Sequence, residues 1–131
     1  MMKYSGDFAN LEKGTKNNRR KNLNFLRAAD AAEIPTGKMK AVKLGGKDIL
    51  LANVAGNFYA IDNKCPHAHA PLSHGKLEDC AVKCPLHGAT FDVTTGKNLT
   101  DAKIIFFKMK AKDAHAYKVK VEDANVLVDL S

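Results

Sequence analysis

The chain has 131 residues, of which 45% are hydrophobic and 27% charged, and its formal net charge is +7. These values fit one ordinary domain that buries a core without disulfide support. No apolar run approaches the roughly 20 residues that span a bilayer, and the chain does not start like a signal peptide, so we expect no membrane span and a cytoplasmic location.

More than half of the excess positive charge lies in the first 30 residues, which carry seven basic and three acidic side chains. We interpret residues 1–23 as a solvated, partly disordered basic extension and residues 24–131 as the folded domain. The alternative is a tail that binds nucleic acid or an acidic membrane. The extension offers no aromatic stacking platform and no recognised motif, and the body is evenly charged, so we expect no nucleic-acid partner.

Short β-rich segments follow one another from about residue 24 onward. The stretch 22–34 is the one helix candidate, but it lacks a clean apolar stripe, and we predict a strand over 25–29. Gly45-Gly46 is a strong two-residue hairpin signal, because both positions tolerate positive φ. It separates the predicted strands 38–44 and 47–54, and a turn at 55–57 leads into a strand at 57–62.

The second half of the chain continues in the same way. The predicted strands there are 89–93, which ends in a turn at 94–97, then 103–110, and two strands within 116–130 that are joined by a turn at 122–125. Many short strands with turns every few residues predict an all-β fold, an antiparallel sandwich or barrel.

The segment between the two groups of strands holds the chemistry. Residues 65–88, "CPHAHAPLSHGKLEDCAVKCPLHG", contain all three cysteines of the chain and four of its five histidines. Within this segment, "CPH" places Cys65 two residues before His67, and "CPLH" places Cys84 three residues before His87. Sixteen residues separate His67 from Cys84, which is enough for the chain to return beside itself.

A zinc site commonly takes a cysteine pair from one segment and a histidine pair from another. Here each segment supplies one cysteine and one histidine. A dinuclear cluster explains the mixture, because each loop then reaches both irons. Two histidines on one iron and two cysteines on the other form the ligand set of a Rieske 2Fe–2S centre. A zinc-stabilised binding module remains the alternative from another class.

The full pattern, C-x-H-x16-C-x-x-H with a proline after each cysteine and a glycine after the second histidine, resembles the Rieske ferredoxin family. The likeness covers about residues 24–130. It implies a Rieske fold, with antiparallel sheets and a small inserted cluster-binding subdomain at about residues 63–93, and one 2Fe–2S cluster. It also implies that Cys65 and Cys84 bind the buried iron, and that His67 and His87 bind the outer iron through Nδ1.

The most economical function is then a small one-electron carrier between a reductase and a terminal oxidoreductase, active as a monomer and not an enzyme on its own. The chain is too short for the mononuclear iron domain of an oxygenase. A non-catalytic redox subunit of a multicomponent oxygenase or nitrite reductase is the alternative within redox chemistry. We expect deletion of residues 1–22 to leave the visible spectrum of the cluster unchanged, and loss of that spectrum would show that the extension packs onto the domain.

The remaining cysteine and histidines are interpreted as bystanders. Alternation places Cys80 on the same face of a short strand as Val82, as a small buried apolar residue. His69, His74 and His115 are expected at the surface. The aromatic residues expected in the core are Phe58, Tyr59, Phe91, Phe106 and Phe107.

Departures from the high-potential members of the family are informative. Those proteins carry an extra cysteine in each loop where this chain has Ala70 and Leu86, so the disulfide between their loops has no counterpart here. They also place a serine and a tyrosine hydroxyl near the cluster, at the positions of Ala89 and Phe91. Hydrogen bonds to sulfur favour the reduced cluster, so we expect a potential in the lower part of the range of roughly −150 to +300 mV.

Overall fold

The computed structural model describes residues 24–66, 70–86, 88–100 and 112–131. The predicted strand at 103–110, with Phe106 and Phe107, lies outside the described residues. The elements in chain order are β1 (Phe25–Asp30), the short 3-10 helix η1 (Ala31–Glu33), β2 (Met39–Leu44), β3 (Lys47–Val54), β4 (Asn57–Asp62), the 3-10 helix η2 (Leu72–His74), β5 (Lys76–Glu78), β6 (Ala81–Lys83), β7 (Thr90–Asp92), β8 (Ala116–Glu122) and β9 (Asn125–Asp129).

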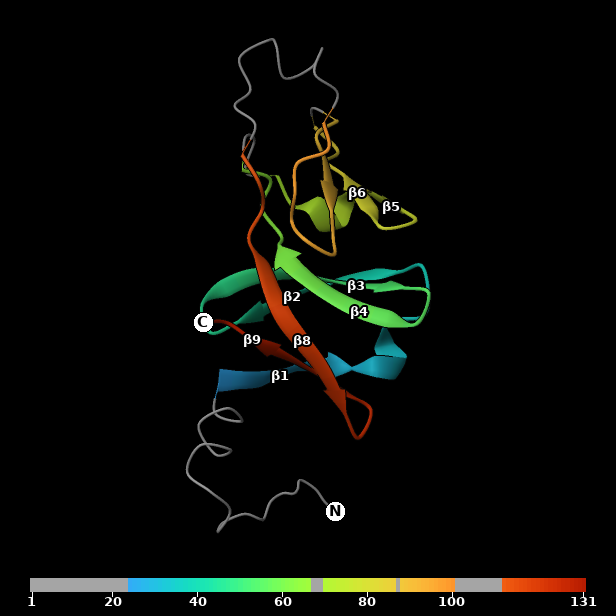
Figure 1. The fold of residues 1–131 in the computed structure, drawn as a ribbon, viewed down its shortest axis with the longest axis vertical. Helices are drawn as coiled ribbons and strands as arrows, with labels where there is room; N and C mark the ends of the chain where they lie inside the picture. The colour runs from blue at the N-terminus through green and yellow to red at the C-terminus, as the bar shows by residue number, and fades with distance from the viewer. Residues whose placement is uncertain (1–23, 67–69, 87, 101–111) are drawn as a thin grey trace.

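The strands form two antiparallel sheets, which confirms the predicted all-β class (Figure 1). A six-stranded sheet has the order β1-β9-β8-β4-β3-β2, and a three-stranded sheet has the order β5-β6-β7. The smaller sheet comes from the segment between β4 and β8, so it is an insertion into the larger one. It matches the subdomain expected at about residues 63–93. No helix in the described residues is long and apolar enough to cross a membrane.

Tight turns set the registers of the larger sheet. Gly45-Gly46 joins β2 to β3 with φ values of 56° and 81°, as predicted. The turns between β3 and β4 and between β8 and β9 also have two central residues at positive φ, and the second of these, Asp123-Ala124, contains no glycine. Positive φ at both positions matches the right-handed twist of the flanking strands.

The segment 25–34 is a strand followed by a 3-10 turn rather than a helix. β1 pairs with β9, with a register shift between Arg27 and Ala29, and the alanine-rich stretch at Ala31–Glu33 forms η1. Helix propensity at the alanines was therefore overridden by pairing with a strand about 100 residues away in the sequence.

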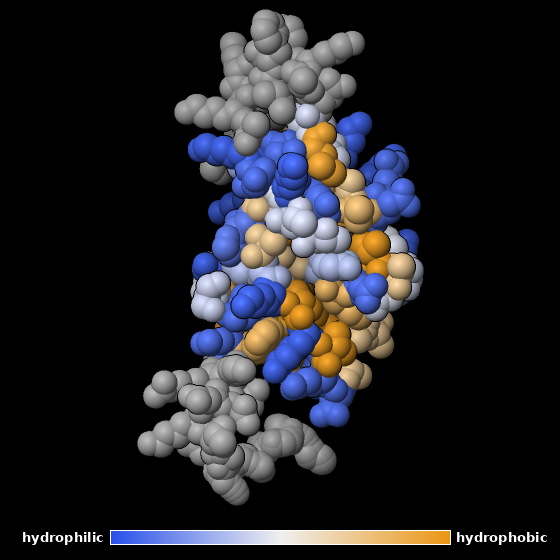
Figure 2. All heavy atoms as spheres, in the orientation of Figure 1, coloured by the Kyte–Doolittle hydropathy of each residue, from blue (hydrophilic) through white to orange (hydrophobic). Residues whose placement is uncertain are grey.

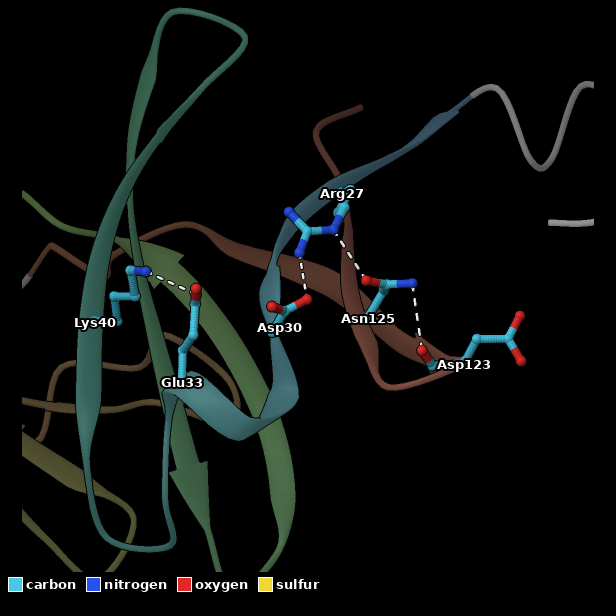
Figure 3. Close-up of polar contacts among 6 residues, drawn as sticks. All are labelled: Arg27, Asp30, Glu33, Lys40, Asp123 and Asn125. Carbon is cyan, nitrogen blue, oxygen red and sulfur yellow. Dashed lines mark hydrogen bonds and ion pairs between the residues drawn. The ribbon is translucent and has the colours of Figure 1, made fainter. Parts of the chain in front are cut away.

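Exposed polar pairs surround this junction (Figure 3). Arg27 donates from Nε to Oδ1 of Asn125 at 2.9 Å and also contacts the Asp30 carboxylate. Lys40 on β2 pairs with Glu33 of η1 at 2.7 Å. These pairs are solvent-exposed, so each contributes little to stability and mainly orients the surface side chains.

Buried side chains form two cores on opposite faces of β3. The strand core consists of Ala29, Ile34, Ile49, Leu51, Ala60, Tyr117, Val126 and Val128. The cysteine core consists of Leu50, Ala52, Ile61, Cys65, Ala70, Leu72, Val82, Cys84, Ala89, Phe91, Val93 and Ala114.

Alternation along β3 sends Ile49 and Leu51 into the strand core and Leu50 and Ala52 into the cysteine core, which explains four consecutive buried apolar residues in this strand. The strand core collects side chains from β1 and β9 as well as β3 and β4, so the larger sheet curls around it. In Figure 1, β1 and β9 accordingly lie below β3 and β4. In the space-filling view of Figure 2, hydrophilic and apolar residues are interspersed on the visible face.

A part-buried hydrogen bond connects β8 to β4. The Tyr117 hydroxyl donates to Oδ1 of Asp62 at 2.5 Å, and the Tyr117 side chain lies in the strand core. Burial, and then the hydrogen bond to Asp62, raise the pKa of Tyr117 well above its ordinary value of 10. The neutral hydroxyl is therefore the form that the fold stabilises.

Tyr117→Phe is expected to lower the free energy of unfolding by about 1–2 kcal/mol at neutral pH, because Asp62 loses its donor. Above about pH 10 the unfolded tyrosine loses its proton while the folded one keeps it, so the stability of the wild type falls and the difference between the two proteins narrows. Urea unfolding of both proteins over a series of pH values measures this. A difference that stays constant beyond pH 10 would contradict the role given to the hydroxyl.

Candidate metal centre

Two loops with the same backbone frame hold the predicted ligands. The N–H of Cys65 donates to the carbonyl of Ala70 at 2.9 Å, and the N–H of Cys84 donates to the carbonyl of Ala89 at 2.6 Å. Each bond joins a cysteine to the residue five positions later. The residues just outside are also paired, Lys64 with Pro71 and Lys83 with Thr90. The two loops therefore begin and end with the same pattern of backbone hydrogen bonds, although their histidines stand at different positions after the cysteine.

The two loop cysteines are brought into one apolar environment. The exposed fraction is 0% for Cys65 and 2% for Cys84, and both belong to the cysteine core. Ala70 and Ala89, which close the loops, are buried beside them. Leu50 and Ile61 of the larger sheet belong to the same core, so β3 and β4 form the floor under both loops.

Two glycines shape the loops, one where the loops meet and one where the second loop turns. A Cβ on Gly75, which follows η2, would lie 1.8 Å from the carbonyl oxygen of Lys83, so the backbone leaving the first loop touches the backbone that starts the second. Gly88 has a φ of +73° and its N–H donates to the carbonyl of Cys84 at 3.2 Å, which turns the chain back toward β7.

Asn63 supports the first loop through two hydrogen bonds. Its carbonyl accepts from the N–H of Leu72 at 2.6 Å, and its side-chain Oδ1 accepts from the N–H of Ser73 at 2.8 Å. The side chain is buried, so these bonds satisfy a polar group that would otherwise be costly there. Sequence reasoning missed both Asn63 and Gly75, because their partners lie about ten residues away; the only signal was an amide residue close to a cysteine.

The structure describes two of the four predicted ligands. Cys65 and Cys84 lie together in the cysteine core, whereas His67 and His87 lie outside the described residues, as does His69. Among the residues that are described, no group of three or more His, Cys, Asp or Glu side chains could hold a metal ion. The assignment of all four ligands, Cys65, His67, Cys84 and His87, therefore stays a prediction.

The bystanders that the structure describes lie mostly where they were expected. Cys80 is half-buried, packs against the edge of the cysteine core, and its carbonyl accepts from the N–H of Val93. His74 and His115 are exposed, and the His115 ring packs edge-on against Tyr117 at 4.5 Å between centroids. Phe91 is fully buried, while Phe58 and Tyr59 are partly buried at the edges of the two cores.

The donor set fits an iron–sulfur cluster. Two thiols are buried in one apolar core, and cysteine sulfur is a soft ligand that suits such clusters. At the positions where the high-potential proteins carry their extra cysteines, this chain has Ala70, which is buried, and Leu86, which is 63% exposed.

Adding hydroxyl groups beside the cysteines is expected to raise the reduction potential. Ala89 and Phe91 are both fully buried in the cysteine core. If each hydroxyl of Ala89→Ser with Phe91→Tyr favours the reduced form by about 1 kcal/mol, the midpoint rises by roughly 40 mV for each. A spectroscopic redox titration of the variant and the wild type measures the shift. An unchanged midpoint would mean that these side chains do not face the cluster.

Two matched loops, each begun by a buried cysteine and set on an antiparallel sheet, define a two-loop metal-binding domain. Residues 24–104 match the family model of the Rieske [2Fe-2S] domain. The chain belongs to the Rieske [2Fe-2S] domain family.

Several relatives that this chain covers almost completely are ferredoxin components of dioxygenase systems. The chain is 40% identical over 107 residues to the ferredoxin component of the naphthalene 1,2-dioxygenase/salicylate 5-hydroxylase systems of Ralstonia sp, covering 82% of this chain and 96% of the relative. The ferredoxin of carbazole 1,9a-dioxygenase from Nocardioides aromaticivorans IC177 superposes with a TM-score of 0.72 at 28% identity, covering 82% of this chain and 98% of that one.

A second solved structure is a complex of reduced oxygenase and oxidised ferredoxin in carbazole 1,9a-dioxygenase. It matches with a TM-score of 0.70 at 26% identity, covering 80% of this chain and 92% of the matched chain. This chain is thus an electron-transfer protein rather than a catalytic subunit, and its cofactor is one Rieske-type 2Fe–2S cluster.

Proposed function

We propose that this chain is the ferredoxin component of a multicomponent oxygenase system, taking one electron at a time from a reductase and passing it to a terminal oxygenase. The observation that carries the proposal is the pair of matched loops that bury Cys65 and Cys84 in one core. The near-complete coverage of ferredoxin components among the relatives supports it.

We assign the cluster to Cys65 and Cys84 on one iron and to His67 and His87 on the other. The bound cluster supplies reversible one-electron redox chemistry. The chain contributes the rest. The cysteine core excludes water from the two sulfurs, and the matched backbone hydrogen bonds hold the two loops rigid. A rigid site changes little between oxidation states, which suits repeated electron transfer.

The organisation of the whole chain follows from the same proposal. Residues 1–23 are a basic extension and residues 24–131 the Rieske domain, which acts as a cytoplasmic monomer. Nothing in this arrangement requires the extension for cluster binding.

Electron uptake and delivery test the proposed function. Reductive titration of the purified protein with dithionite is expected to consume one electron per chain and to reverse on reoxidation. Mixing the reduced protein with oxidised terminal oxygenase of the naphthalene 1,2-dioxygenase type is expected to reoxidise it at a rate that rises with oxygenase concentration. Failure to take up an electron, or loss of the cluster in each cycle, would overturn the proposal.

A further inference from the structure

The inserted three-stranded sheet separates its charges along its length. The register places Lys76, Lys83 and Thr90 side by side in the row next to the second loop. The row at the far end contains Glu78, Ala81 and Asp92. One end of this small sheet is therefore basic and the other acidic.

The basic row contains an unfavourable pair. Lys76 and Lys83 lie directly opposite each other on adjacent antiparallel strands, and both side chains are exposed. Within the described part of the chain, neither makes an ion pair with an acidic residue. Like charges directly opposite each other destabilise a sheet. Folding of the domain gains nothing from this pair.

The two lysines stand beside the loop that is assigned to the cluster. Lys83 immediately precedes Cys84, and its Cε would lie 3.5 Å from a Cβ on Gly88, so its aliphatic chain runs along the second loop. Lys64 holds the equivalent position before Cys65 and is also largely exposed, although its Nζ lies 3.6 Å from an oxygen of Asp48.

An exposed apolar residue completes the surface. Leu86 on the second loop is 63% exposed, the largest exposed fraction among the large apolar side chains that are described. Transient electron-transfer contacts are small, and protein interfaces commonly surround an apolar centre with a polar rim. Leu86 with Lys76 and Lys83 has this composition; we call these three residues the basic loop face.

We propose that the basic loop face docks the acidic surface of a redox partner protein, with carboxylates opposite the lysines and an apolar contact at Leu86. This inference rests on the proposed electron-carrier function and adds the chemistry of the partner. The net charge of +7 attracts such a partner from a distance. The charges at the two ends of the inserted sheet then orient the domain so that the row with Lys76 and Lys83 faces the partner.

A pair of small redox probes of opposite charge tests this face without the unidentified partner. One electron passes from the reduced protein to ferricyanide, which becomes ferrocyanide, or to tris(phenanthroline)cobalt(III), which becomes the cobalt(II) complex. Stopped-flow rates are measured as a function of ionic strength. Oxidation by the anionic ferricyanide is expected to slow as salt is added, and oxidation by the cationic cobalt complex to accelerate.

Neutralising one lysine at a time shows which part of the surface causes the charge dependence of the oxidation rate. Lys83→Gln is expected to slow oxidation by ferricyanide by roughly three- to tenfold at low ionic strength, because the trivalent anion loses one nearby charge. Lys118→Gln removes the same charge from β8 in the larger sheet and is the matched control. Equal slowing of ferricyanide oxidation by the two substitutions would show that the rate depends only on the net charge of the protein, and it would overturn the proposal.

Lys76→Glu provides a second signature. It replaces the like-charge pair with Lys83 by an opposite-charge pair, so the melting temperature is expected to rise while oxidation by ferricyanide slows. If instead Lys76→Glu and Lys83→Gln weaken sedimentation with phosphatidylserine vesicles but leave both probe rates unchanged, the face binds a membrane and the proposal is wrong. A protein that holds no cluster and takes up no electron would contradict the proposed function itself. Unchanged probe rates in a protein that still carries one electron would contradict only the docking proposal.

Discussion

Cys84→Ala is expected to abolish assembly of the 2Fe–2S cluster, whereas Cys80→Ala leaves it in place. Cys84 is buried in the cysteine core together with Cys65, and its N–H starts the bond that closes the second loop. Cys80 precedes β6, is half-buried at the edge of that core, and acts through its carbonyl. Iron content and the visible absorption of both variants measure the outcome, with Cys65→Ala expected to behave as Cys84→Ala.

The three cysteines can be compared directly because all three lie within 20 residues of the sequence and none of them forms a disulfide. Removing a thiolate from the cluster leaves iron without a ligand that only cysteine supplies well. Removing Cys80 deletes one sulfur from a partly exposed position, which costs little. Loss of as much iron from Cys80→Ala as from Cys84→Ala would place Cys80 among the ligands and contradict the assignment.

Gly75→Ala is expected to separate the two loops and to lower the free energy of unfolding by about 3 kcal/mol or more. The new Cβ would stand 1.8 Å from the carbonyl oxygen of Lys83 and 2.9 Å from its carbon, so backbone must move. Lys83 directly precedes Cys84, and the displacement therefore reaches a predicted ligand. We expect reduced cluster occupancy along with the loss of stability.

Gly56→Ala is the matched control for this substitution. Gly56 lies in the turn between β3 and β4 with a φ of +91°, and a Cβ there meets no atom within 4 Å. Alanine at that position carries only the backbone cost of about 1–2 kcal/mol. Denaturant unfolding measures the stability of the two variants, and iron content measures their cluster occupancy. If Gly75→Ala kept full cluster occupancy and lost no more stability than Gly56→Ala, the loops would not depend on this contact.

The strands of the larger sheet were predictable because their signals are local. Turn residues such as Gly45-Gly46 mark the ends of each strand, and the predicted bounds of 47–54 and 57–62 agree with β3 and β4. The likeness in the Cys/His segment also indicated the inserted subdomain. Both kinds of signal are written in a few neighbouring residues.

Features that depend on contacts between distant residues were not predictable. Alternation does not show that β3 separates two cores, because a strand buried on both faces has no polar side. The equal closure of the loops is visible only in the backbone bonds of Cys65 and Cys84. Gly75 stands in an ordinary turn, and its need for a small residue arises from Lys83 on another strand.

The central claim is that this chain holds one Rieske-type 2Fe–2S cluster, and iron and acid-labile sulfide analysis of the purified protein tests it most directly. The account predicts two irons and two sulfides per chain, with no zinc. Zinc bound in the absence of sulfide would contradict it.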